Sequence, residues 1–188
     1  MRAAFEHIAG LIQQMVTVPG DFGEFGVWHG DTFMGIAEAA CAAGKVAHAV
    51  DSFRGMEPPT PMDFDAQGKC LYDEGALSVG GSQAFRARVL RFGKGVEVWE
   101  GYIPIVLYRM AFLSFAFAHV DLDQYRPTRH TLTWLWPRMS PGGIVCCHDW
   151  IADRRRLASQ AIREWMTCAR VDPAGEKKES RHIWFRKP

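Results

Sequence analysis

The chain lacks the patterns that point to a membrane or to a nucleic-acid partner. No run of about 18 apolar residues occurs, so no helix is expected to span a membrane. Residues 1–7 include an acid and lead into no long apolar core, unlike a secretory signal peptide. The formal net charge of +1 gives no basic or acidic excess, which argues against nucleic acid and anionic membranes as partners.

Cysteine is sparse, and none of the five cysteines forms a CxxC pair. An odd number of scattered cysteines is typical of reduced thiols, so we expect a cytoplasmic protein without a zinc site built from cysteine. The GxGxxG, GxSxG, HExxH and P-loop patterns are also absent. The missing GxGxxG argues against a dehydrogenase, the alternative among nucleotide-using enzymes.

Strand-like and helical segments alternate along the chain. Helical spacing occurs at residues 3–16, 32–43, 83–90, 127–136 and 154–166. Strand composition occurs at residues 23–28, 46–50, 96–99, 115–122, 144–147, 168–171 and 182–185. This alternation is typical of an α/β fold, with a doubly wound, mostly parallel sheet.

Length and composition favour one domain over residues 1–188. The chain is 48% hydrophobic, which is enough to bury a substantial core, and no boundary divides it. Residues 1–18 hold the N-terminal helix. Residues 54–81 contain Pro58, Pro59 and Pro61 and show no periodicity. A loop this long is predicted to be a lid or substrate loop, or else disordered.

A glycine-rich turn follows the first strand, with Glu24 among glycines 23, 26 and 30. Glycines between a strand and a helix let a ligand approach the backbone at the helix N-terminus. An acid there would repel a pyrophosphate but suits a cationic ligand such as S-adenosylmethionine. His29 is a further candidate for ligand contact. The alternative is an ordinary glycine turn in which Glu24 and His29 are solvated.

Asp51 ends the second strand and Glu100 ends the third. An acid after the second strand can accept both ribose hydroxyls, which together with the glycine turn favours a nucleoside site. Glu100 and Gly101 would then face the adenine. The alternatives are a helix N-cap formed by Asp51 and Ser52, and a solvated Glu100.

Two neighbouring strand ends carry acids. Asp121 and Asp123 follow one apolar run, where alternation would place them on one face, and His148 and Asp149 follow the next. Close carboxylates are costly unless a cation or proton lies between them. Asp121 and Asp149 suit Mg²⁺, and His148 would move the preference toward Mn²⁺, Fe²⁺ or Zn²⁺. The alternative is that Asp123 and Asp149 cap the segments that follow.

Two basic features have structural interpretations. His119 lies in an apolar strand and is predicted to be a core histidine rather than a ligand. The run at residues 154–156 is predicted to be a solvated helix start, with contact to an anionic substrate as the alternative.

Five segments occur in a fixed order within roughly residues 20–150. They are Glu24-x-Gly-Val-Trp-x-Gly30, Asp51-Ser-Phe-x-Gly55, Glu100-Gly-Tyr-Ile-Pro104, His119-Val-Asp-Leu-Asp-x-Tyr125 and Ser140-Pro-Gly-Gly-Ile144. In this order they resemble the macrocin O-methyltransferase family. The resemblance implies a Rossmann-like class I methyltransferase with seven strands, one antiparallel in a C-terminal hairpin. It also implies methylation of sugar hydroxyls in natural products, with S-adenosylmethionine and Mg²⁺.

The resemblance also implies roles for the residues of the cofactor site. The turn with Glu24, Gly26, Trp28 and Gly30 would hold the methionine part of S-adenosylmethionine. The rest of the nucleoside would be held by the ribose ligand Asp51, by Ser52 and Phe53 beside the adenosine, and by Glu100 and Gly101 at the adenine.

By the same resemblance, Asp121 would be the first metal ligand and Asp123 the general base. His148 and Asp149 stand where the family has an Asp-Asp pair. Members of the family also have a longer N-terminal region before the first glycine turn, which this chain reaches by residue 23.

The expected activity is methyl transfer from S-adenosylmethionine to a hydroxyl of a sugar or similar small molecule. A divalent cation, Mg²⁺ or Mn²⁺, would lower the pKa of that hydroxyl, and Asp123 would take its proton. The alternative is a methyltransferase-like cofactor-binding protein with a degenerate metal site and little or no catalysis. The acceptor stays open, and an exposed first helix is compatible with a homo-oligomer.

Overall fold

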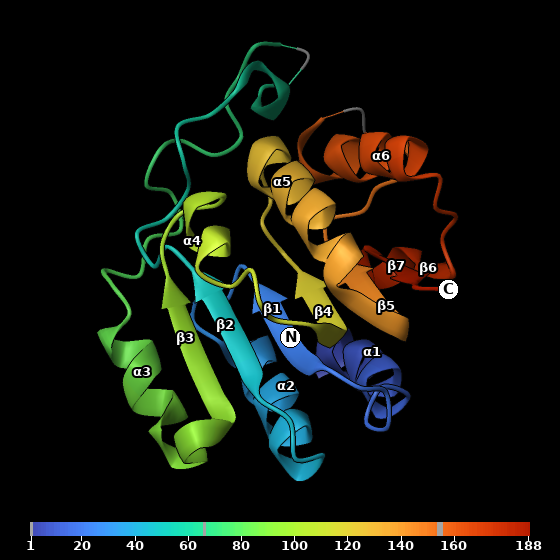
Figure 1. Ribbon diagram of the computed structural model, residues 1–188. Coiled ribbons are helices and arrows are strands. Elements are labelled where there is room, and N and C mark those ends of the chain that lie inside the picture. The colour runs from blue at the N-terminus through green and yellow to red at the C-terminus, as the bar shows by residue number, and fades with distance from the viewer. Residues whose placement is uncertain (1, 66, 154–155) are drawn as a thin grey trace.

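The computed structural model describes residues 2–65, 67–153 and 156–188. Its strands form a seven-stranded sheet in the order β3-β2-β1-β4-β5-β7-β6 (Figure 1). The strands are β1 (Asp21–Phe25), β2 (Ala47–Asp51), β3 (Val96–Glu100), β4 (Phe115–Val120), β5 (Met139–Cys147), β6 (Gly175–Lys177) and β7 (His182–Arg186). Strands β1 to β5 pair in parallel, whereas β7 is antiparallel to both β5 and β6. The predicted α/β fold class is confirmed.

Helices cover both faces of this sheet. Figure 1 shows α5 in front of the strands and α2 behind them. One buried apolar cluster joins the sheet to α1 (Arg2–Gln13), α2 (Asp31–Ala42) and α3 (Gln83–Val89). A second cluster joins it to α4 (Ile105–Tyr108), α5 (Tyr125–Leu135) and α6 (Leu157–Ala169). The short 3-10 helices are η1 (Pro61–Asp63), η2 (Leu90–Gly95), η3 (Trp136–Arg138) and η4 (Lys178–Ser180).

Burial on both faces explains why the central strands are continuous apolar runs. Every residue of β4 is buried, as a strand between two helical layers requires. The first helix shows the matching pattern, because Ile8, Leu11 and Ile12 lie on its buried face.

Several predicted boundaries are wrong. The strand predicted at residues 168–171 does not form, because α6 continues to Ala169 and ends at Arg170 in the left-handed conformation. The strand predicted at residues 144–147 begins earlier, at Met139. The first strand ends at Phe25, and the short helix α4 was not predicted. The helix predicted from residue 154 begins at Leu157; residues 154 and 155 of the basic run lie outside the described part of the chain.

The order of the strands creates a switch point between β1 and β4. From β1, the chain goes outward through β2 to β3 and then returns to β4 on the other side. Ligands of open α/β sheets bind at the carboxyl ends of the strands beside such a point. No helix among the described residues is long and apolar enough to cross a membrane.

Candidate active site

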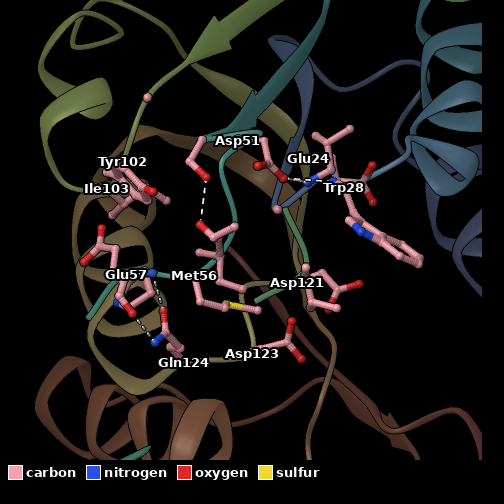
Figure 2. A pocket seen from close by; sticks show the side chains of 18 of the residues that line it. Glu24, Trp28, Asp51, Met56, Glu57, Tyr102, Ile103, Asp121, Asp123 and Gln124 are labelled. Carbon is pink, nitrogen blue, oxygen red and sulfur yellow. Dashed lines mark hydrogen bonds between the residues drawn. The ribbon is translucent and has the colours of Figure 1, made fainter. Parts of the chain in front are cut away.

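A pocket of about 620 Å³ opens at this switch point. Its walls come from the ends of β1 and β2, from the loops that follow β1, β2, β3 and β4, and from the first turns of α2 and α5. Figure 2 shows Glu57, Tyr102 and Ile103 on one side of the pocket and Trp28 on the other, with Asp121 and Asp123 below Asp51. Of the predicted cofactor residues, the lining includes Glu24, Gly26, Trp28, Gly30, Asp51, Ser52 and Gly101.

The glycine turn after β1 is packed too closely for side chains at two positions. Gly26 has a φ of 90°, and a Cβ there would lie 1.8 Å from the backbone oxygen of Asp121. Gly30 has a φ of 86°, and a Cβ there would lie 2.4 Å from the ring of Phe85. The turn therefore lies directly against the loop after β4 and presents its backbone to the pocket.

Asp51 holds this turn in place. Its Oδ2 accepts hydrogen bonds from the backbone N–H groups of Val27 (2.7 Å) and Trp28 (2.8 Å), and its Oδ1 accepts one from Phe53 (2.6 Å). No helix begins directly after β2, where residues 52–60 form a loop, so the alternative of a helix N-cap at Asp51 is wrong. The carboxylate instead links the turn after β1 to the end of β2 and still lines the pocket.

Glu24 is a buried acid on β1, 1% exposed. Its Oε1 lies 2.8 Å from Nδ1 of His119 in a hydrogen bond, and its Oε2 has no partner among the described residues. Burial raises the pKa of Glu24 to about 7, although the hydrogen bond with His119 acts in the opposite direction. The prediction of a buried His119 is confirmed, whereas a solvated Glu24 is wrong.

Two predicted cofactor residues do not line this pocket. Phe53 is 1% exposed, and its ring lies 5.2 Å from that of Phe85 in the core. The carboxylate of Glu100 accepts a hydrogen bond of 2.5 Å from Ser82 and faces Arg86 at 3.8 Å. The side chain of Glu100 is 32% exposed, so it is partly solvated while Ser82 and Arg86 bind its carboxylate.

The residues predicted to hold a metal do converge. Ligand atoms of Asp121, His148 and Asp149 all lie within 4.8 Å of one another. Nδ1 of His148 lies 3.0 Å from Asp121 Oδ1 and 3.4 Å from Asp149 Oδ1, and Arg181 Nη1 lies 3.3 Å from the same Asp149 oxygen. Burial alone would lower the pKa of His148, but the hydrogen bonds and charges of the two carboxylates raise it to about 10.

Asp123 lies beside this group but not on a strand. Strand β4 ends at Val120, and Asp123 has a φ of 56°, so the predicted alternation of Asp121 and Asp123 on one strand face is wrong. Both residues nevertheless line the pocket. Burial raises the pKa of Asp123 well above its ordinary value. Its hydrogen bond with Asp149 and the nearby charges of Asp149 and Asp121 raise the pKa further.

The irregular segment 54–81 contributes residues that the motifs do not include. Met56, Glu57 and Leu77 line the pocket, and the hydroxyl of Tyr72 donates a hydrogen bond of 2.9 Å to Asp123 Oδ1. No periodicity marks these positions, so the sequence gives no indication of them. The lining residues Tyr102 and Ile103 lie inside the motif at residues 100–104 and could have been found from it.

Comparisons with known families and with known sequences both identify methyltransferases as relatives of this chain. A family described as a methyltransferase domain matches residues 24–150. The chain is 33% identical over 155 residues to 8-demethyl-8-(2,3-dimethoxy-alpha-L-rhamnosyl)-tetracenomycin-C 4'-O-methyltransferase of Streptomyces olivaceus, covering 78% of this chain and 59% of that protein. It is 30% identical over 156 residues to mycinamicin III 3''-O-methyltransferase of Micromonospora griseorubida, with 78% and 61% covered. The chain thus spans about three fifths of the length of these relatives.

Solved structures share the fold. The calicheamicin methyltransferase CalS11 superposes with a TM-score of 0.81 at 21% identity, covering 98% of this chain and 79% of that one. An O-methyltransferase from Bacillus cereus in complex with SAH gives a TM-score of 0.66 at 13% identity, covering 100% and 82%. At these identities the likeness is one of architecture.

Proposed function

Because the chain belongs to the methyltransferase domain family, we propose that it transfers a methyl group from S-adenosylmethionine to a hydroxyl of a sugar or similar small molecule. The observation that carries this proposal is a single pocket lined by three acidic residues, each in a different setting. Glu24 is buried with an unpartnered oxygen, Asp51 lies at the end of β2, and Asp123 lies at the entrance to α5.

The cofactor would lie along the carboxyl edge of the sheet. The ammonium of its methionine part would pair with Glu24, whose Oε2 lacks a partner among the described residues. The ribose would lie at Asp51, whose carboxylate uses three of its roughly four lone-pair sites for backbone N–H groups and can accept one further hydrogen bond. The adenine would lie between Ser52, Gly101 and the neighbouring Ile103.

Asp123 would act as general base, taking the proton of the acceptor hydroxyl as the oxygen attacks the methyl carbon. Burial raises the pKa of Asp123, which makes its carboxylate a stronger base. Asp123 must first lose its own proton, because only the ionised carboxylate can take up the proton of the acceptor. Leu122 and Pro127 line the same region and would exclude water from the reacting atoms.

The residues Asp121, His148 and Asp149 fit a divalent cation, since their donor atoms converge and two of them are carboxylates. His148 must lose its proton to serve as a ligand, and its imidazole favours Mn²⁺ over Mg²⁺. When bound, such a cation lowers the pKa of a coordinated hydroxyl.

A second candidate function is that of a cofactor-binding protein with a degenerate metal site. The observation that favours it is the pairing of both carboxylates with cations of the chain itself. His148 contacts Asp121 and Asp149, and Arg181 contacts Asp149. In this alternative the protein binds S-adenosylhomocysteine but neither binds Mn²⁺ nor transfers methyl groups.

Within the methyltransferase domain family, we propose membership of the macrocin O-methyltransferase group. The relatives named above, a tetracenomycin 4'-O-methyltransferase and a mycinamicin 3''-O-methyltransferase, support a sugar-bearing acceptor. We also propose that residues 1–188 form one domain in which segment 54–81 covers the acceptor. A cytoplasmic location and a homo-oligomer stay predictions.

The test combines binding and turnover. Calorimetry with S-adenosylhomocysteine measures cofactor affinity, and labelled methyl transfer to phenyl α-L-rhamnoside and catechol measures activity with Mg²⁺, with Mn²⁺ and with a chelator. We expect cofactor binding, metal-dependent transfer, and loss of transfer but not of binding in Asp123→Asn. Activity that is indifferent to the chelator would contradict the metal role, and full activity of Asp123→Asn would remove Asp123 from the mechanism.

A further inference from the structure

Tyr72 reaches the proposed base from a distant part of the sequence. Its hydroxyl donates a hydrogen bond of 2.9 Å to Asp123 Oδ1, and the two residues are 51 positions apart. Asp123 lies in a loop with a left-handed backbone, where no regular element fixes its side chain. The phenol is therefore one of two side chains that hold this carboxyl group, the other being that of Asp149.

The segment that carries Tyr72 is attached to the same loop at two further points. Gln124, 2% exposed, accepts a hydrogen bond from the backbone N–H of Glu57 (3.1 Å) and donates one to the backbone oxygen of Glu57 (2.9 Å). Oδ1 of the buried Asp63 accepts a hydrogen bond from the backbone N–H of Tyr125 (2.9 Å). Three consecutive residues, 123–125, are thus each bonded to segment 54–81.

A fourth attachment comes from the residue that precedes α6. Arg156, at the start of α6, donates a hydrogen bond of 2.5 Å to the backbone oxygen of Phe64. Within the segment, Phe64 pairs with Cys70, and Cys70 Sγ donates to the backbone oxygen of Tyr72 (3.1 Å). The part of the segment that carries Tyr72 is therefore bonded to the start of α6 as well as to residues 123–125.

The surroundings of Tyr72 keep its hydroxyl protonated, so that it stays a hydrogen-bond donor. Burial, together with the neighbouring charge of Asp123, raises the pKa of Tyr72 above its ordinary value, so the hydroxyl keeps its proton. A carboxylate offers about four lone-pair sites. The hydrogen bond from Tyr72 and the contact with Asp149 orient Asp123 and still leave sites for the hydroxyl of an acceptor.

We propose that Tyr72 is a positioning residue for methyl transfer, which holds the Asp123 carboxylate toward the acceptor hydroxyl. This inference rests on the proposed function. In the step, the acceptor oxygen forms a bond to the methyl carbon while the bond from that carbon to the sulfonium breaks. The acceptor proton passes to Asp123, neutral S-adenosylhomocysteine leaves, and Tyr72 keeps its own proton throughout.

The test uses Tyr72→Phe with Tyr125→Phe as a matched control, because Tyr125 also donates its hydroxyl to a carboxylate, Glu164 Oε2 at 2.5 Å. Labelled methyl transfer to phenyl α-L-rhamnoside and catechol gives kcat and KM, and calorimetry gives the Kd of S-adenosylhomocysteine. For Tyr72→Phe we expect kcat to fall about tenfold, the effect of one hydrogen bond to a charged group, with KM and Kd within about twofold of wild type. For Tyr125→Phe we expect all three unchanged.

The outcomes separate the inference from the proposed function. A wild-type kcat in Tyr72→Phe overturns the positioning role, and so does a raised KM with unchanged kcat, which would mark a substrate contact instead. Equal losses in Tyr72→Phe and Tyr125→Phe would mark a general structural effect and also overturn it. If the wild-type protein transfers no methyl group to either probe, the proposed function fails and the positioning role fails with it.

Discussion

The pairing of Glu24 with the cofactor ammonium makes cofactor affinity depend on pH. Burial raises the pKa of Glu24 to about 7 in the free protein. An ammonium binds the ionised carboxylate, which is about nine tenths of the population one pH unit above that pKa and about one tenth one unit below it. We therefore expect the affinity for S-adenosylhomocysteine to fall about tenfold between these two pH values, that is, on acidification.

The variant Glu24→Gln keeps the size of the side chain and removes its charge. Loss of one charged hydrogen bond of about 2 kcal/mol predicts a Kd about thirtyfold higher above pH 7, with little dependence on pH. Calorimetry with S-adenosylhomocysteine is suitable because its amino-acid ammonium keeps its proton over this range. Glu38→Gln is the control, because Glu38 is exposed and its partner is Arg91 at 2.7 Å.

The same substitution has an opposite effect on stability. The folded protein keeps a proton on Glu24 up to about pH 7, whereas the unfolded chain releases it near its ordinary value of 4.5. The folded state therefore loses stability as pH rises through this window, by at most about 3 kcal/mol. Urea unfolding should show Glu24→Gln more stable than wild type above pH 7.

Cofactor affinity that is independent of pH in the wild type, or equally pH-dependent in Glu24→Gln, would refute the reasoning.

Three further predictions concern the glycine turn and the metal residues. Gly26→Ala places a methyl group 1.8 Å from a backbone oxygen, so urea unfolding should show a loss of roughly 3 kcal/mol or more, whereas Gly10→Ala, at an open position of α1, should gain up to about 1 kcal/mol. His148→Asp should raise the affinity for Mg²⁺ relative to Mn²⁺ in calorimetric titrations, because an oxygen ligand replaces nitrogen; an unchanged ratio would exclude His148 as a ligand. Asp121→Ala should remove any stimulation of methyl transfer by metal ions, and stimulation that persists would place the cation elsewhere.

The sheet was predictable because its central strands are buried on both faces. The run at residues 115–120 is apolar at every position, which is the composition that a strand between two helical layers requires. The edges were less predictable. Residues 168–171 have strand composition, but α6 continues to Ala169, which packs partly buried against the second apolar cluster, before Arg170 ends the helix. Local composition does not include this tertiary packing.

The acids of the site were found because strand ends of a parallel sheet meet at one edge. The same argument does not predict the conformations of these acids. Alternation along a strand does not extend to Asp123, since the strand ends three residues earlier and the backbone turns left-handed. The pairing of Glu24 with His119 was likewise not predicted, because these residues are 95 positions apart on adjacent strands whose register is visible only in the sheet.

Segment 54–81 makes specific contacts that a sequence without periodicity does not predict. It was predicted as a lid or a disordered loop, yet it is fixed by single side chains such as Asp63 and Gln124. Such contacts depend on the position of the partner strand and leave no repeat in the sequence. For that reason Tyr72, which contacts Asp123, could not be selected from the sequence.

The most direct test of the central claim is a crystal structure of the chain grown with S-adenosylhomocysteine and Mn²⁺. The account predicts the ammonium of the ligand at Glu24, its ribose at Asp51, and an anomalous peak for Mn²⁺ between Asp121 and Asp149. A ligand bound outside this pocket, or a pocket that stays empty at saturating ligand, would contradict it.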